Sequence, residues 1–133
     1  MAAGDVTKLN IFVKGILAGY LYGAYIYFVT DTGEIARYTI SDGSIDYPFT
    51  TFTYNTAAHE LKVGLKSKKI TALAGSTTTL YCAMDDGTIF SITTGYAVVF
   101  LARLPGKVVA MQYASNVLYA VLDDGTVYTV ATA

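Results

Sequence analysis

Two pairs of adjacent aspartates are the residues of this chain that most resemble a reaction centre. Asp85 and Asp86, and then Asp123 and Asp124, each open the tetrapeptide Asp-Asp-Gly-Thr. Paired carboxylates can exchange protons with a substrate or hold a divalent cation. Here each pair lies between two apolar runs, where an aspartate before glycine starts a turn by bonding to its own backbone. The pattern therefore predicts structural turns, with weak metal binding as the alternative.

The other reactive side chains are isolated in the sequence. His59 is the only histidine and Cys82 the only cysteine, so neither has the partner that a metal site or a disulfide requires. The two arginines, Arg37 and Arg103, lie in different segments with no sign of convergence. We therefore predict no catalytic residue, no metal site and no cofactor, and we expect that the chain is not an enzyme.

The only cluster of like charge consists of four lysines, Lys62, Lys66, Lys68 and Lys69. No aromatic residue that could stack on a base lies among them, which favours a solvated loop over a phosphate or acidic-partner contact. The formal net charge of -1 also argues against a nucleic-acid partner, which usually needs a basic face.

Aromatic residues gather in the segment 41–56, SDGSIDYPFTTFTYNT, which carries only two charged side chains. Aromatic surfaces of low charge are suited to contacts with proteins or sugars. We therefore predict an interaction site formed by Tyr47, Phe49, Phe52 and Tyr54. The alternative is an extended hairpin that packs on its own sheet or on a second copy of the chain.

An internal repeat positions these residues. Residues 69–90 align without a gap with residues 107–128, and a weaker copy lies at 15–38. Each copy contains β-rich runs that flank a glycine turn, and residues 96–104 read as a fourth strand. The first copy is longer than the others by an insertion, which we place at 41–56, between its third and fourth strands.

Four antiparallel strands in roughly 40 residues, repeated in tandem, are typical of a β-propeller blade. The pattern LYA-x-x-DDGT-(V/I)-Y resembles the generic blade hairpin of pyrroloquinoline-quinone-type and related propellers. This resemblance covers most of residues 15–133 and implies the architecture alone, because the chain has no tryptophan and no Trp-Asp pair. We expect an all-β, propeller-like fold with three four-stranded blades, at about 15–66, 69–104 and 107–133.

The two ends of the chain suggest a way to complete the last blade. The last copy stops at Ala133 after its third expected strand, while residues 6–16 align with residues 98–108. Residues 6–13 are therefore expected to supply the missing strand, in their own chain or in a partner. Closed propellers typically have four to eight blades, so we expect a homodimer with six blades, and a compact three-sheet monomer is the alternative.

The composition restricts the function without specifying it. With 133 residues, 53% hydrophobic and 14% charged, the chain can form one folded domain. The first residues lack the pattern of a signal peptide and no uncharged stretch is long enough for a membrane helix, so we expect a soluble protein, cytoplasmic or in a virion. We predict a structural or protein-interaction module that self-assembles, with lectin-like carbohydrate binding as the alternative. The scarcity of Asn and Gln is compatible with a thermophilic source, and a virus of such a host is one origin that we consider.

Overall fold

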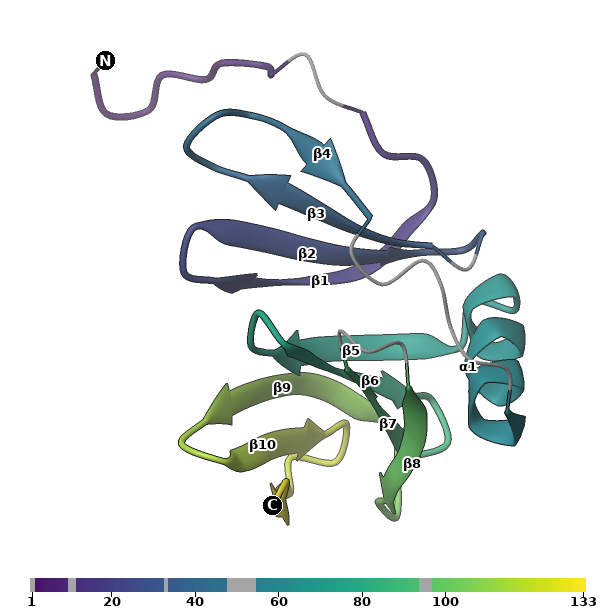
Figure 1. Cartoon of the computed structure of the whole chain (residues 1–133). Helices are drawn as coiled ribbons and strands as arrows, with labels where there is room; N and C mark the ends of the chain where they lie inside the picture. The colour runs from purple at the N-terminus through teal and green to yellow at the C-terminus, as the bar shows by residue number, and fades with distance from the viewer. Residues whose placement is uncertain (1, 10–11, 33, 48–54, 94–96) are drawn as a thin grey trace.

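A computed structural model describes residues 2–9, 12–32, 34–47, 55–93 and 97–133 of the chain (Figure 1). Within these residues the chain forms three antiparallel sheets and one helix. The first sheet contains β1 (Ile16–Tyr22), β2 (Tyr25–Thr30), β3 (Ile35–Thr39) and β4 (Ile45–Asp46). The second contains β5 (Ile70–Gly75), β6 (Thr79–Met84), β7 (Thr88–Thr93) and β8 (Val98–Arg103). The third contains β9 (Val108–Ala114), β10 (Val117–Leu122) and β11 (Val127–Ala131), and the helix α1 (Thr56–Lys66) precedes the second sheet.

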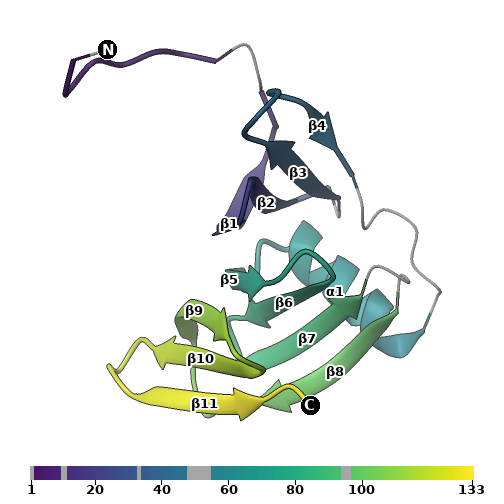
Figure 2. The ribbon, with the colours of Figure 1, turned by 60° about the vertical axis from the view of Figure 1, so that its left-hand side comes forward.

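Each sheet is a meander, in which every strand pairs with the next one along the chain. The first strand of the second sheet, β5, contacts β1 on one side and β9 on the other. The three sheets therefore fan out from their first strands, with the second sheet between the other two (Figure 2). This arrangement confirms the expected all-β fold class, to which the structure adds one helix.

The repeat is visible in the backbone hydrogen bonds as well as in the sequence. The same N–H to C=O bond recurs once in each sheet: Asp31 to Gly15 at 2.9 Å, Asp85 to Lys69 at 2.8 Å and Asp123 to Lys107 at 2.9 Å. The turn glycines Gly87 and Gly125 both have a φ near +90°, which strains any other residue. Each donates its N–H to the residue three positions earlier, at 3.0 Å. Equivalent residues thus form equivalent turns.

The core consists of two apolar clusters that lie on opposite faces of the second sheet. One cluster joins that sheet to the first sheet and to α1, and it includes Tyr27, Leu61 and Phe90. The other joins it to the third sheet and includes Tyr81, Ile89 and Leu118. Strands buried on both faces carry few polar residues. This double burial explains the high apolar content of the repeat.

The insertion lies elsewhere than the sequence predicted. Strand β4 follows β3 after a short turn, so the extra residues come after the fourth strand and not before it. They lead into α1, which Asn55 caps by accepting a hydrogen bond from the N–H of Ala58 at 2.8 Å. The expected lysine loop was therefore wrong for Lys62 and Lys66, which lie on this helix. Its apolar residues at Ala58, Leu61 and Leu65 follow helical spacing and are buried, which leaves the lysines outside.

The first residues of the chain lie apart from the third sheet. Residues 5–9 and 12–13 belong to no strand, and the segment extends away from the first sheet (Figures 1 and 2). In the described part of the chain the third sheet has three strands. Completion of this sheet by residues 6–13 of a second copy stays a prediction. No helix among the described residues has the length and apolar character needed to cross a membrane.

Candidate interaction sites

One of the four aromatic residues predicted to contact a partner lies in the described part of the chain. Tyr47 directly follows β4 and is 42% exposed. Phe49, Phe52 and Tyr54 lie outside the described residues. The role of the four residues as an interaction site therefore stays a prediction. The exposure of Tyr47 leaves its side chain accessible to a partner.

The second aspartate of each pair holds a turn. The Oδ1 atom of Asp86 accepts a hydrogen bond from the N–H of Thr88 at 3.0 Å, and Oδ1 of Asp124 accepts one from the N–H of Thr126 at 2.9 Å. Thr126 also donates its hydroxyl to Asp124. These are the side-chain bonds that start a turn, as the sequence predicted.

Hydrogen bonding also keeps these carboxylates ionised. Partial burial opposes the negative charge of Asp86, but the bonds from Thr88 and the nearby charge of Arg103 outweigh it and lower the pKa. The bonds from the side chain and backbone of Thr126 lower the pKa of Asp124. A general acid needs a raised pKa, so this environment suits a turn and does not suit a general acid.

Of the other reactive residues, Arg37, Arg103 and Cys82 lie apart from one another. Arg37 pairs with Asp46 through Nε at 2.9 Å and an amino group at 2.5 Å, while Arg103 lies 3.4 Å from Asp86 in another sheet. Cys82 is fully buried, and this burial raises the pKa of its thiol well above the ordinary range. No group of three or more histidine, cysteine or acidic residues that could hold a metal gathers within the described ranges.

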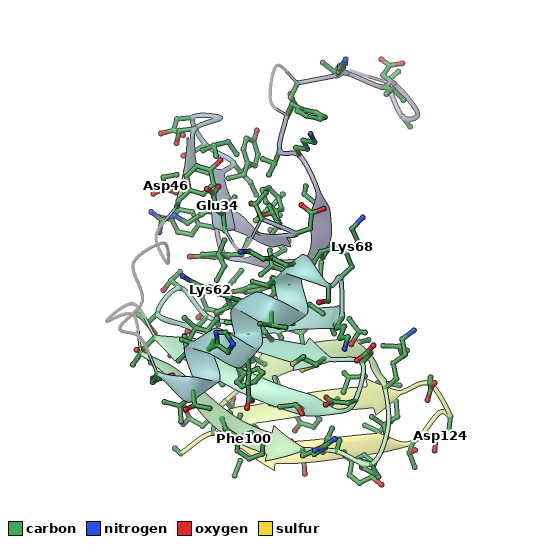
Figure 3. The ribbon with its side chains drawn as sticks, turned by 90° about the vertical axis from the view of Figure 1, so that its right-hand side faces the viewer. Glu34, Asp46, Lys62, Lys68, Phe100 and Asp124 are labelled. Carbon is green, nitrogen blue, oxygen red and sulfur yellow. The ribbon has the colours of Figure 1, made fainter. Side chains whose placement is uncertain are left out.

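A groove that the sequence did not reveal runs between α1 and the outer part of the second sheet. It has a volume of about 560 Å³, which is in the range of small-ligand sites. Its lining residues come from the helix, from the residue before β5, from the β6–β7 hairpin and from β8: His59, Glu60, Val63, Gly64, Lys69, Met84, Asp86, Thr88, Phe100 and Arg103. Figure 3 looks onto this side of the molecule, with α1 in front and Phe100 labelled on the sheet.

Two contacts fix the helix wall of this groove. Asn55 caps α1 with its side-chain oxygen and donates its Nδ2 to the carbonyl of Val98, at 3.1 Å, on the edge strand β8. Gly64 packs so closely that a Cβ there would lie 2.8 Å from the Cε of Met84. The sequence signal that could have revealed the helix is Asn55 followed by buried residues at helical spacing.

A second hollow lies along the inner strands β1, β5 and β9. It has a volume of about 460 Å³, and its lining contains no charged residue. Tyr20 closes one side by donating its hydroxyl to the carbonyl of Ser76 at 2.7 Å, and it stacks on Tyr27 with ring centroids 5.0 Å apart. Burial, with the neighbouring Tyr27, raises the pKa of Tyr20 well above its usual value. This surface is uncharged, unlike the groove beside α1.

Similar folds occur among solved structures, although no family model and no curated protein sequence matches the chain. The computationally designed Ika8 protein superposes with a TM-score of 0.56 at 19% identity, over 88% of this chain and 33% of that one. The WD40 β-propeller domain of Doa1 gives a TM-score of 0.56 at 10% identity, over 88% and 38%. YCF48 bound to a D1 peptide gives 0.56 at 10% identity, over 87% and 37%.

This chain folds as an arc of β-propeller blades. Its three sheets are the blades, and β1, β5 and β9 are their inner strands. The chain spans about a third of the length of the three proteins just compared. At identities below 20% the likeness shows the fold alone, because propellers host many functions.

Proposed function

We propose that the chain is a non-enzymatic protein-interaction module that pairs with a second copy to form a six-bladed ring. One observation carries this proposal: apolar residues that are exposed on the third blade and the N-terminal segment occupy repeat positions that are buried in the second blade. The repeat thus shows, within one chain, how such positions pack when a neighbouring blade is present.

The free face of the third blade supplies the first comparison. In the second blade Tyr81 is 5% exposed and Ile89 0% exposed, because both pack on the third blade. Their equivalents Tyr119 and Val127 are 44% and 62% exposed. A sheet face that is apolar at repeat-equivalent positions is suited to packing on another blade.

The N-terminal segment supplies the second comparison. In the second blade Val98 and Leu104, on and just after the outer strand, are 1% and 9% exposed. The aligned residues Val6 and Phe12 are 94% and 87% exposed. Burial of two such side chains would remove from water an apolar surface worth about 3 to 6 kcal/mol. We infer that Val6–Val13 of one copy forms the outer strand of the third blade of the other.

The surroundings of Gly125, in the turn between β10 and β11 of the third blade, leave room for this strand. The carbonyl of Gly87 accepts a hydrogen bond from the N–H of Leu104 at 2.9 Å, and a Cβ on Gly87 would lie 2.1 Å from the carbonyl oxygen of Leu104. Around the equivalent Gly125, no atom of the described residues other than its own and those of its two chain neighbours lies within 4 Å of such a Cβ. In the proposed dimer Phe12 of the second copy takes the place that Leu104 has beside Gly87.

The first blade offers the matching face. Within the chain Leu80 and Cys82 of the second blade pack toward the first blade. Their equivalents Ile26 and Phe28 lie on the face of β2 opposite the buried Tyr27 and Val29. In the dimer, the free face of the third blade would therefore pack on the Ile26 and Phe28 face of the partner's first blade. That face is equivalent to the Leu80 and Cys82 face of the second blade, which packs on the first blade within one chain. A two-fold ring repeats this contact twice.

Partner binding is the proposed role of the ring. YCF48 has been solved with a bound peptide on a similar fold, which supports peptide or protein binding as the class of activity. We assign the contact surface to Tyr47, Phe49, Phe52 and Tyr54, because aromatic residues dominate the energies of protein interfaces.

Light scattering after gel filtration tests the assembly. At 50 to 100 µM protein the full chain is expected at twice the 14.2 kDa of one copy. Deletion of residues 2–13, or the double change Val6→Ser and Phe12→Ser, is expected to give the single-chain mass. The change Thr7→Ser in the same segment is the control. A full chain of 14.2 kDa, or a deletion that leaves the mass doubled, would contradict the proposal.

A further inference from the structure

The α1 groove belongs to one blade alone. No helix in the described part of the chain precedes the first or third blade, so neither has an equivalent wall. The helix is held from both sides, by the Asn55 contact with β8 and by the buried side chains of Leu61 and Leu65. A site whose walls are fixed before binding loses little entropy when a ligand enters.

Exposed apolar side chains form the middle of the groove. Val63 on the helix is 48% exposed and Phe100 on β8 is 52% exposed, with the half-buried Met84 between the helix and the hairpin. Large apolar side chains left this open to water in a rigid groove favour an apolar occupant. The occupant needs at least one apolar side chain.

The rim of the groove carries charges of both signs. Asp86 and Arg103 neutralise each other at 3.4 Å. Glu60 on the helix and Lys69 before β5 form no ion pair with any other described residue. A complementary ligand therefore presents one basic and one acidic group, which argues against a nucleic acid or a simple anion.

We propose that this groove binds an extended peptide in which an apolar residue lies between a basic and an acidic residue. The apolar side chain packs on Phe100 and Val63, the basic side chain pairs with Glu60 and the acidic one pairs with Lys69. Strand β8 is the outer strand of its sheet, so beyond the Val98 carbonyl, which Asn55 already occupies, its edge offers backbone groups to an extended chain. This proposal rests on the proposed interaction role and not on ring formation.

Selection from a random octapeptide display library on the full chain provides the probe. The recovered peptides are expected to share a basic–apolar–acidic pattern, in either direction along the peptide. One selected peptide is then made synthetically and titrated by calorimetry, with the mass of the protein measured in the same buffer. The mass shows whether the dimer forms, and the titration shows whether the groove binds the peptide, so the two proposals are tested separately.

Matched variants locate the binding. Phe100→Ala is expected to weaken the selected peptide at least tenfold, whereas the neighbouring Val99→Ala, also exposed, is expected to leave it within twofold. Lys69→Glu is expected to weaken it at least tenfold, and a peptide with lysine in place of the acidic residue is expected to restore binding to this variant. Urea unfolding of each variant shows that the fold is retained.

Three results would overturn the proposal. The first is a selection that yields no peptide binding below 1 mM, and the second is equal binding to Phe100→Ala and Val99→Ala. The third comes from a synthetic peptide of residues 2–13, which contains Asp5, Val6 and Lys8. If this peptide binds the groove more tightly than every selected sequence, the occupant is a second copy of the chain.

Discussion

Asp86 stabilises a turn through two contacts that a neighbouring aspartate does not share. Its carboxylate accepts from the backbone of Thr88 and lies near Arg103, while the side chain of Asp85 makes no hydrogen bond or ion pair with the described residues. Asp86→Ala is expected to lower the free energy of unfolding by about 1 kcal/mol, since solvent screens the exposed ion pair and the hydrogen bond remains the main loss. Asp85→Ala is the control, with a change within about 0.5 kcal/mol. Urea unfolding at pH 7 measures both, and equal losses would contradict the assignment.

The contribution of Asp86 depends on pH in a defined direction. Its pKa is lower in the folded state than the value of about 3.9 usual in an unfolded chain. The stabilisation is therefore present above about pH 4 and is lost as the pH falls through the folded value. The difference between the wild-type chain and Asp86→Ala is expected to be constant from pH 5 to 8 and to shrink below pH 4. A difference that grows on acidification would show that another group dominates.

Gly87 and Gly125 share a conformation but not an environment. Both have positive φ, so alanine strains either backbone by about 1 to 2 kcal/mol. At Gly87 the new Cβ also overlaps the carbonyl of Leu104, which adds about 1 to 3 kcal/mol. In the chain without residues 2–13, Gly87→Ala is therefore expected to lose more stability than Gly125→Ala. Thermal unfolding monitored by circular dichroism compares the two variants.

At the level of elements, α1 depends on Asn55. Asn55→Ala removes both the cap of the helix and the bond to Val98, and it is expected to destabilise the chain by about 1 to 2 kcal/mol. Asn55→Asp keeps the acceptor for the Ala58 N–H but loses the amide donor, so an intermediate loss is expected. Urea midpoints of the three proteins provide the measurement. Identical midpoints for Asn55→Asp and Asn55→Ala would show that the cap contributes nothing.

The strands could be predicted from the sequence because the same strand pattern recurs in three copies of the repeat. Asp-Gly or Thr-Gly turns between β-rich runs give the hairpins β2–β3, β6–β7 and β10–β11, and the alignment of one copy with the next gives their limits. The helix occurs once, so no second copy indicates its position. Its signals are local, namely an asparagine cap and the buried positions Ala58, Leu61 and Leu65.

The candidate sites also differ in whether the sequence could predict them. The turn role of Asp86 and Asp124 followed from chemistry that adjacent residues carry out among themselves. The α1 groove brings Val63 together with Phe100, which lies far along the chain on a different element. Such a site depends on how the helix packs on the blade, and the spacing of its residues in the sequence contains no sign of it.

At the scale of the whole molecule, equivalent positions have opposite surroundings. Ile89 is buried between two blades, whereas Val127 lies on the free face of the third blade. Val127→Glu is expected to change the stability of a single chain by less than about 0.5 kcal/mol, because the side chain stays in water. The same change is expected to abolish the dimer, since it places a charge against the first blade of the partner. Sedimentation velocity measures the dimer, and a full dimer with Val127→Glu would exclude this face from the interface.

Ile89→Glu is the matched variant for this comparison. It buries an unpaired carboxylate inside the chain and is expected to prevent folding, with loss of the strand signal in circular dichroism. If both variants folded equally well, the two positions would not differ as the structure describes. The pair therefore separates the packing of blades within a chain from the packing between chains.

The position of α1 before a single blade has a consequence for valency. A ring of two chains carries two α1 grooves, on opposite sides of a two-fold axis, whereas a groove on every blade would give six. In the proposed ring, a partner with two suitable segments joined by a linker that spans this separation would bind both grooves with avidity beyond either contact alone. The asymmetry of one blade would thus give the proposed ring two binding sites with a fixed spacing.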